Sequence, residues 1–312
     1  MEMLKAMHVP VIDLSLLRLD SHTRYLVIEE IREACQTAGI FYVINHGISE
    51  TVIEEALKVN AEFFDMPLEM KEELVSGDVL KPVRYSTAEG EAQGNFRDFL
   101  KLYAHPFEDF VESWPKSPPD YREKMGKYTM EVRKLAIEIF GAIMESLNLR
   151  ATYLEDNIEQ GMHIVGINNY PPSTNSNINV GIPAHSDHSI ITILLQTSSG
   201  LHIIDKTDHA WKLVPELKGA LQVLVGDHLE VLSNGSYRPV FHRVVQESSS
   251  HRRLSIANFQ SLGMDDILET ANELVDEEHP KKYKGSSLRD YFKNLSSVAS
   301  KPFLETLKLQ NE

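Results

Sequence analysis

Cysteine is nearly absent from this sequence, since Cys35 is the single one among 312 residues. It cannot form an internal disulfide, so the fold has to rest on its core, and a reducing, cytoplasmic setting is expected. The first 19 residues lack a basic segment followed by an apolar stretch, which argues against a signal peptide. Long apolar runs are missing too: the longest candidates, residues 190–195 and 219–225, fall far short of the roughly 20 residues of a membrane span. We expect no integral membrane protein.

Positive charge is scarce. The chain has 31 basic and 46 acidic residues, a formal net charge of -15. Such a field repels polyanions, which argues against nucleic acids and anionic membranes as partners. A small-molecule ligand fits better, and an anionic ligand has to be held by locally placed cations. We expect a monomer rather than an obligate oligomer.

The hydrophobic pattern changes twice along the chain. Residues 9–14 and 40–44 read as short strands, and residues 51–64 and 128–147 carry apolar side chains at helical spacing. Gly39 can end the helix that precedes the second strand. Residues 81–120 predict loops and one strand. Beyond Met162, short runs of Ile, Val and Leu alternate with turns, which is typical of a β-barrel or jelly roll. After Gly263 a charge-rich helical pattern returns.

We therefore expect an α+β fold with a jelly-roll core wrapped by N-terminal and C-terminal helices. Residues 1–160 are predicted to form an N-terminal α/β region that packs on the core. Residues 161–262 are predicted to form the catalytic core, and residues 263–312 a C-terminal helical region. The three regions are expected to form one integrated structural unit.

A histidine and a carboxylate lie two residues apart in His185-Ser186-Asp187. On a β-strand this spacing directs both side chains to one face, where they can chelate a metal. A third ligand from a distant strand, with His242 as the natural candidate, completes a facial triad. Two histidines and one carboxylate are the ligands of non-haem iron(II) oxygenases. The sequence thus predicts an iron(II) site at His185, Asp187 and His242.

A second triplet, His228-Leu229-Glu230, has the same spacing, so the spacing alone does not decide between the two. His185 follows a proline-containing turn and enters an apolar strand, whereas His228 follows the turn-like Gly226-Asp227, which favours the first triplet. The other histidines considered are expected away from the metal: His188 at the rim, and His202, His209 and His251 on loops or edges.

Arginine and serine recur at strand spacing in Arg253-Leu254-Ser255. Because side chains alternate along a β-strand, the guanidinium and the hydroxyl lie on the same face of the strand. Together they can bind a carboxylate there. A buried arginine near a metal needs an anionic partner, whereas its neighbour Arg252 reads as a surface residue.

Together these motifs resemble the plant-type 2-oxoglutarate- and iron(II)-dependent dioxygenases, which have an isopenicillin N synthase-like fold. The resemblance runs through nearly the whole chain. The matching segments are VPVIDL at 9–14, AGIFYVINHGI at 38–48, Arg97-Asp98-Phe99, Asn168-Asn169-Tyr170-Pro171-Pro172, His185-Ser186-Asp187, Gly226-Asp227, LSNG at 232–235, His242-Arg243-Val244 and Arg253-Leu254-Ser255.

The resemblance implies a distorted double-stranded β-helix and assigns roles residue by residue. His185, Asp187 and His242 would bind iron(II), and Arg253 and Ser255 the distal carboxylate of 2-oxoglutarate. By the same resemblance, Tyr170 and Asn168 would assist near the co-substrate, and His46 and His228 would lie in structural motifs. The positions that line the substrate in relatives correspond to Phe99, Lys101, Gly166 and Phe259.

The implied reaction consumes O2 and converts 2-oxoglutarate to succinate and CO2 while a substrate is hydroxylated, desaturated or otherwise oxidised. Ascorbate can serve as an added reductant. A small plant specialised metabolite, flavonoid- or alkaloid-like, is the expected substrate class. Three rivals stay open here: a same-fold iron oxidase that uses ascorbate instead of 2-oxoglutarate, a non-catalytic binding protein, and a zinc hydrolase, which gives Arg253 no purpose.

Overall fold

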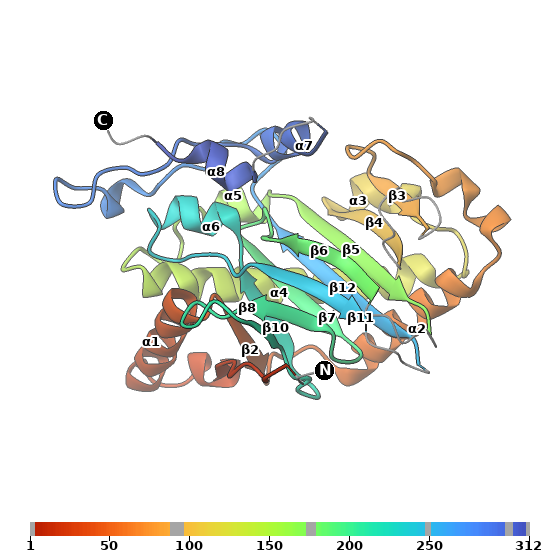
Figure 1. Ribbon diagram of the computed structural model, residues 1–312, viewed down its shortest axis with the longest axis horizontal. Helices are drawn as coiled ribbons and strands as arrows, with labels where there is room; N and C mark the ends of the chain where they lie inside the picture. Colours follow the sequence, from red (N-terminus) through yellow and green to blue (C-terminus); the bar gives the residue numbers. More distant parts are fainter. Residues whose placement is uncertain (1–3, 88–96, 173–178, 247–250, 297–301, 310–312) are drawn as a thin grey trace.

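The computed structural model describes residues 4–87, 97–172, 179–246, 251–296 and 302–309. Its strands form two sheets (Figure 1), one with the order β1-β2-β10-β7-β12-β5-β4-β3 and one with the order β6-β11-β8-β9. All pairings are antiparallel except that of β1 with β2. The strands are β1 Val11–Asp13, β2 Ile40–Ile44, β3 Val83–Ser86, β4 Asp98–His105, β5 His163–Tyr170, β6 Asn179–His185, β7 Ile191–Gln196, β8 Leu201–Ile204, β9 Trp211–Leu213, β10 Leu221–Val225, β11 His242–Gln246 and β12 Arg253–Gln260.

The two sheets face each other across an apolar layer to which both contribute, including Leu194 and Leu224 from the large sheet and Ile203 and Val244 from the small one. Two facing sheets of mainly antiparallel strands are the arrangement of a jelly roll. The expected α+β fold with a jelly-roll core is therefore confirmed.

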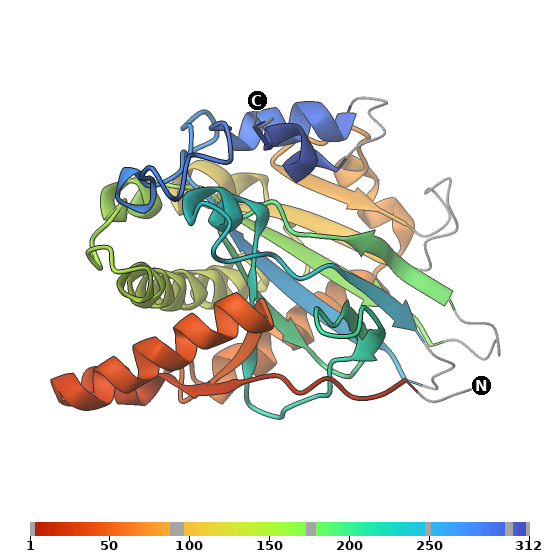
Figure 2. The same ribbon diagram turned by 60° about the vertical axis from the view of Figure 1, so that its left-hand side comes forward.

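Helices cover the outside of the large sheet. The long helix α4 packs against β7 and β12 and is flanked by α1 and α2. In both views the C-terminal helices α7 and α8 lie along the top of the sheets, and α1 lies at the bottom (Figure 1, Figure 2). The α-helices are α1 Ser21–Thr37, α2 Glu50–Asp65, α3 Phe107–Phe110, α4 Tyr121–Ser146, α5 Glu155–Glu159, α6 Asp227–Leu232, α7 Leu288–Ser296 and α8 Phe303–Leu307. Within the described part of the chain, no helix has the length and apolarity to span a bilayer.

Local signals in the sequence set the helix ends. The Asp20 carboxylate accepts hydrogen bonds from the backbone N–H groups of His22 and Thr23 and so caps α1. Gly39 follows α1 with φ of +71°, a left-handed conformation that glycine adopts without strain. Its N–H donates to the Ala34 carbonyl, which ends the helix as predicted.

Strand alternation divides the large sheet into two faces. On β12, Leu254 and Ile256 join the core under the helices, whereas Ser255 and Ala257 face the cavity between the sheets. The cross-strand register extends this cavity face sideways, because Ser255 pairs with Asn168 and Ala257 pairs with Gly166. Strands β5, β7 and β12 of the large sheet thus each offer alternate residues to the cavity.

Three expectations need correction. Residues 81–120 hold two strands, β3 and β4, rather than one. The segment from 263 to 287 consists mainly of turns, isolated bridges and one 3-10 turn, so the predicted charge-rich helix is confined to the short α7 and α8. His202 lies on β8 between β11 and β9 and is 3% exposed, not on a loop or an edge.

Candidate metal centre and its cavity

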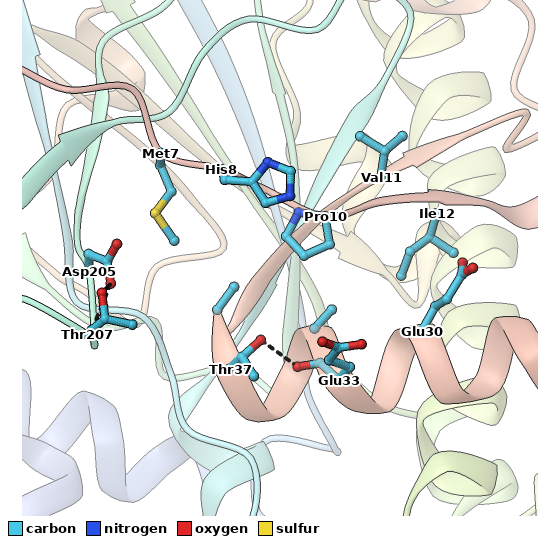
Figure 3. Close-up of a pocket in the computed structure, with 12 residues that line it drawn as sticks. Met7, His8, Pro10, Val11, Ile12, Glu30, Glu33, Thr37, Asp205 and Thr207 are labelled. Carbon is cyan, nitrogen blue, oxygen red and sulfur yellow. Dashed lines mark hydrogen bonds between the residues drawn. The ribbon is translucent and has the colours of Figure 1, made fainter.

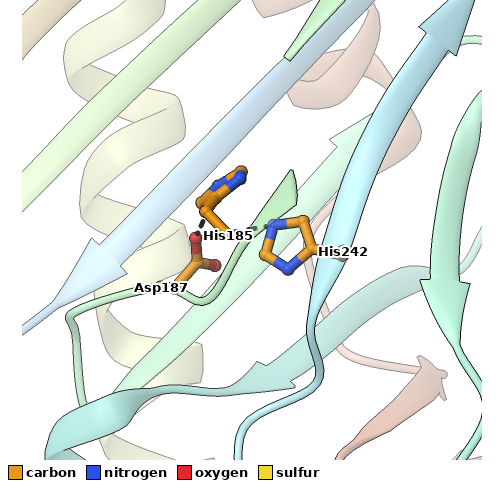
Figure 4. A group of neighbouring side chains, drawn as sticks. All are labelled: His185, Asp187 and His242. Carbon is orange, nitrogen blue, oxygen red and sulfur yellow. Dashed lines mark ion pairs between the residues drawn. The ribbon is translucent and has the colours of Figure 1, made fainter. Parts of the chain in front are cut away.

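His185, Asp187 and His242 lie together between the two sheets (Figure 4). His185 ends β6 and His242 begins β11, and the two are direct cross-strand partners. The Nε2 atoms of His185 and His242 lie 3.5 Å and 3.6 Å from one carboxylate oxygen of Asp187. Among the histidines, cysteines, aspartates and glutamates of the described ranges, these three form the one group whose ligand atoms all lie within 4.8 Å of one another.

The other ring nitrogens of the two histidines face backbone carbonyls. Nδ1 of His185 lies 2.8 Å from the carbonyl oxygen of Pro183, and Nδ1 of His242 lies 3.1 Å from that of Val240. Since a carbonyl only accepts, each Nδ1 carries the proton and donates it. This arrangement leaves both Nε2 atoms, which are the ones near the Asp187 carboxylate, as the metal-binding nitrogens.

Asp187 is held by a turn rather than by strand parity. It lies beyond the last residue of β6, so the alternation expected for His185-Ser186-Asp187 does not extend to it. Its backbone carbonyl accepts a hydrogen bond of 2.7 Å from the N–H of Asp227, and the N–H of Gly226 donates to Ile190 over 3.0 Å. The turn at Gly226-Asp227 therefore fixes the loop that carries the carboxylate.

The rival triplet lies in this supporting turn. His228 is 1% exposed in α6, and its Nε2 lies 3.1 Å from the Ser286 hydroxyl. The Glu230 carboxylate accepts a hydrogen bond from the Tyr283 hydroxyl. Neither side chain belongs to the metal-ligating group. In the turn before α2, His46 Nδ1 accepts a hydrogen bond from the Ile48 N–H.

The protonation states of Asp187 and His242 suit a divalent metal. Burial by itself raises the pKa of Asp187, but His242 and His185 outweigh burial and hold that pKa below its usual value. Burial and the neighbouring His185 lower the pKa of His242 to about 4. At neutral pH, Asp187 is thus anionic and His242 neutral, as metal ligation requires.

A second polar cluster is built around Arg253, which is 4% exposed. Its Nε donates to the Ser198 carbonyl over 3.1 Å, and its Nη2 donates to the Gln196 side chain over 2.9 Å. Nη1 is buried without a hydrogen-bond partner, and so is the hydroxyl of Tyr170, whose ring lies 4.8 Å from the guanidinium. The guanidinium Nη1 and the Tyr170 hydroxyl are thus two buried donors without a partner, one of them on a cation, and this arrangement fits an anionic ligand.

Ser255 and Asn168 lie beside Arg253 on the same face. The Asn168 side-chain amide approaches the Ser255 hydroxyl at 3.4 Å, and Arg97 donates to the Asn168 side-chain oxygen. A cavity of about 270 Å³ is lined by all three triad residues and also by Arg253, Ser255 and Asn168. The metal-ligating group and the carboxylate clamp thus share one chamber.

The chamber continues past Gly166 into a second cavity of about 180 Å³. Phe99, Gly166 and Phe259 line both cavities, and Lys101 lines the second. A Cβ atom at Gly166 would lie 3.2 Å from the Phe99 ring and 3.3 Å from the Phe259 ring, so a larger residue there would fill the passage. All four positions expected at the substrate thus lie on this chamber's walls.

Sequence reasoning missed the wall that α7 supplies. Tyr291, Phe292 and Leu295 line the second cavity. The ring of Tyr291 stacks on that of His188 with centroids 4.1 Å apart, and the ring of Phe259 stacks on the same histidine at 5.4 Å. His188, expected at the rim, is 7% exposed and forms part of the wall. The spacing on α7 predicts only an apolar face and does not say what that face covers.

A different and larger cavity, of about 350 Å³, lies between the segment before β1 and the end of α1 (Figure 3). It shares no lining residue with the two cavities at the triad. Its acidic residues are Glu30, Glu33 and Asp205, of which Asp205 is bound to Thr207 and Lys212, and they form no metal-ligating group among the described residues. This cavity offers no comparable site.

Two family models match the chain. Residues 9–121 match the N-terminal region of non-haem dioxygenases in morphine synthesis, and residues 161–261 match the 2OG-Fe(II) oxygenase superfamily. The fold and the triad are therefore those of a 2-oxoglutarate- and iron(II)-dependent oxygenase. More narrowly, the chain belongs to the plant 2-oxoglutarate-dependent dioxygenase family, as its relatives indicate.

Similar proteins agree over almost the full length. The chain is 42% identical over 304 residues to 2-oxoglutarate-dependent dioxygenase 21, chloroplastic, from Oryza sativa subsp. japonica, covering 96% of this chain and 91% of that protein. It is 41% identical over 305 residues to flavanone 3-dioxygenase 3 from the same plant, covering 96% and 93%. The crystal structure of JOX2 in complex with 2OG, Fe and JA superposes with a TM-score of 0.87 at 26% identity, covering 98% of this chain and 91% of that one.

The chain is thus a 2-oxoglutarate-dependent dioxygenase that uses iron(II) and 2-oxoglutarate. The donor set fits this chemistry, because two imidazole nitrogens and one carboxylate form the facial triad of non-haem iron(II) oxygenases. The buried, unpartnered donors of Arg253 and Tyr170 fit a dicarboxylate co-substrate. The ascorbate-type oxidase, the non-catalytic protein and the zinc hydrolase are set aside.

Proposed function

We propose that this dioxygenase oxidises a small ring-containing metabolite of plant specialised metabolism, flavonoid- or alkaloid-like, in the cavity that Phe99 and Phe259 line. The observation that carries the proposal is the shared chamber, in which the triad lies between a carboxylate clamp and an aromatic wall. The names of two relatives support the class, namely flavanone 3-dioxygenase 3 and, at 33% identity, hyoscyamine 6-dioxygenase from Hyoscyamus niger.

Iron(II) would be held by Nε2 of His185, Nε2 of His242 and a carboxylate oxygen of Asp187. Each histidine is oriented by its Nδ1–H bond to a backbone carbonyl, which fixes the ring before the metal binds. Bound iron(II) and 2-oxoglutarate supply the redox chemistry with O2, which no side chain provides.

Arg253 and Ser255 would bind the distal carboxylate of 2-oxoglutarate. The guanidinium is held in place by Ser198 and Gln196, which leaves Nη1 to donate to the incoming carboxylate. Tyr170 offers its unpartnered hydroxyl beside it, and Asn168 orients the Ser255 hydroxyl. Several hydrogen bonds to the distal carboxylate would hold 2-oxoglutarate in one orientation. The 2-oxo acid group at the other end of the molecule would then be directed to the triad.

The substrate would be positioned by ring contacts rather than by acid or base groups. Phe99 and Phe259 offer faces for a flat ring, and Gly166 leaves the space between them. Buried walls exclude water from the oxidised carbon. The products are then succinate, CO2 and a hydroxylated, desaturated or otherwise oxidised ring compound.

The roles are tested by anaerobic addition of iron(II) and then 2-oxoglutarate, with the visible charge-transfer band of the chelate as readout. Wild type should develop the band, and His242→Ala should not. His202→Ala is the matched control, because His202 is also a buried strand histidine but belongs to neither the triad nor its cavities. An undiminished band in His242→Ala would remove this residue from the metal site. Oxidation of a ring compound in step with succinate formation then tests the substrate class.

A further inference from the structure

A lysine lies on the substrate side of the triad without an acidic partner. Lys101 comes from the middle of β4 and is 7% exposed. Its Nζ donates one hydrogen bond of 2.6 Å, to the Val79 carbonyl, and lies 4.6 Å and 5.5 Å from the ring centroids of Tyr103 and Phe292. An ammonium group has three N–H donors, so two have no hydrogen-bond acceptor among the described residues.

No carboxylate within the described ranges lies at ion-pair distance from Lys101. Of the described residues that line its cavity, Asp187 is the single acidic one, and the proposed role of Asp187 is at the metal. Arg84 lines the same cavity and adds a second cation, with its guanidinium 5.7 Å from the Phe99 ring. Two basic side chains, Lys101 and Arg84, thus line this small cavity in a protein of net charge -15.

Lys71 shows what a purely structural buried lysine looks like in this chain. It is 3% exposed, donates to the Phe64 carbonyl over 2.8 Å and lies near the rings of Phe63 and Tyr85. Unlike Lys101, it lines neither cavity at the triad. The two lysines have similar packing, but only Lys101 has its ammonium group at the wall of a cavity.

The cavity around Lys101 also limits the size of its ligand. Its volume of about 180 Å³ is below the roughly 300–1,000 Å³ of pockets for drug-sized molecules. Four aromatic side chains line it, namely Phe99, Phe259, Tyr291 and Phe292. One or two aromatic rings fit such walls better than an extended three-ring system.

We propose that the substrate of this dioxygenase is a one- or two-ring aromatic carboxylic acid whose carboxylate is bound by Lys101. The inference rests on the proposed function, and it narrows the ring-containing substrate to an anion. The two free N–H donors of Lys101 meet the carboxylate while the rings lie against Phe99 and Phe259. A cationic alkaloid is disfavoured at this site, because it would bring a second positive charge to a buried ammonium.

The electrostatics around Lys101 agree with this assignment. Burial, with a smaller contribution from Arg84, lowers the pKa of Lys101 to about 7, and Asp78 opposes this shift. A bound carboxylate favours the charged ammonium and reverses the shift. Among the described residues, no carboxylate lies at ion-pair distance from this lysine, and a bound acid would supply one.

Matched pairs of acids and methyl esters test the proposal. Benzoate, cinnamate and 2-naphthoate, each beside its methyl ester, are titrated by calorimetry into anaerobic enzyme loaded with iron(II) and saturating 2-oxoglutarate at pH 6.5. Saturating 2-oxoglutarate keeps the acids from the Arg253 clamp. At least one acid should bind roughly ten- to a hundredfold more tightly than its ester, the range for a hydrogen bond to a charged group.

Three variants separate recognition from packing. Lys101→Met should lose the preference for the acid, and Lys101→Arg should keep it. Lys71→Met should keep the preference whatever it does to the midpoint of unfolding. Acids binding no better than esters, no acid binding at all, or a preference that persists in Lys101→Met would each overturn the assignment. If the iron–2-oxoglutarate band does not form before the titration, the proposed function itself fails and this inference fails with it.

Discussion

Replacing Gly226 by alanine should damage the metal centre, although Gly226 touches no ligand side chain. The backbone of Gly226 has φ of -102° and ψ of 171°, which any residue adopts, so the substitution causes no backbone strain. A Cβ atom there, however, would lie 2.7 Å from the Ser189 carbonyl carbon and closer still to its oxygen. Reaching the 3.4 Å of an ordinary contact moves that carbon by at least 0.7 Å (3.4 minus 2.7).

The expected magnitude follows from the bonds that this shift strains. Backbone hydrogen bonds join Gly226 to Ile190 (3.0 Å), Asp227 to Asp187 (2.7 Å) and His228 to Ser189 (3.2 Å). At about 1 kcal/mol each, their loss lowers the free energy of unfolding by about 3 kcal/mol. Since Asp187 is carried by the same loop, iron(II) affinity should fall roughly ten- to a hundredfold, as for other supporting groups around metal ligands.

Urea denaturation of the metal-free protein and anaerobic iron(II) titration measure the two effects. Gly77→Ala is the control, because a Cβ atom at Gly77 meets nothing within 4 Å. The control should match wild type in iron affinity and be equal to it or slightly more stable. The reasoning is refuted if Gly226→Ala behaves like Gly77→Ala in both assays.

Three further predictions concern the cavity. Gly166→Phe should lower turnover of the native substrate roughly tenfold or more and leave 2-oxoglutarate affinity unchanged, because the new ring meets Phe99 and Phe259; equal loss of both would contradict the pocket assignment. Arg253→Gln should weaken 2-oxoglutarate binding about a hundredfold in an anaerobic titration without changing iron(II) binding; unchanged co-substrate affinity would exclude the clamp. Because the lowered pKa of Lys101, about 7, leaves its ammonium charged below that pH and neutral above it, the Kd for an aromatic acid should rise as pH increases past 7. Lys101→Arg should bind the acid equally from pH 6 to 9, and a rise in its Kd like that of wild type would count against the lysine as the titrating group.

Strand alternation made much of the site predictable from sequence. Arg253 and Ser255 share a face because both lie on β12, and Phe99 and Lys101 do so on β4. The pairing of β6 with β11 is a long-range event, yet residue chemistry alone was enough to join His185 with His242. The jelly-roll core followed from short apolar runs separated by turns.

Other parts of the site depend on contacts that spacing does not encode. The wall contributed by Tyr291 requires α7 to return over the cavity, and nothing local in its sequence says so. His188 was misplaced because one strand parity was applied beyond the end of β6, where the chain turns. Gln196 and Ser198 escaped notice because their role is to hold Arg253, and supporting groups carry no motif of their own.

The strand order has a consequence for how the two matched regions relate. The family models divide the chain between residues 121 and 161, yet β2 pairs with β10 and β4 pairs with β5 across that division. A fragment of residues 161–261 would expose β5 and β10 as unpaired sheet edges. The two regions that the family models match are therefore not independent folding units. On the proposed roles, the later module holds the metal and the co-substrate, while β4 of the earlier one brings Phe99 and Lys101 to the substrate. Exchanging the earlier module between relatives would change which molecule is oxidised and leave the oxidising machinery in place.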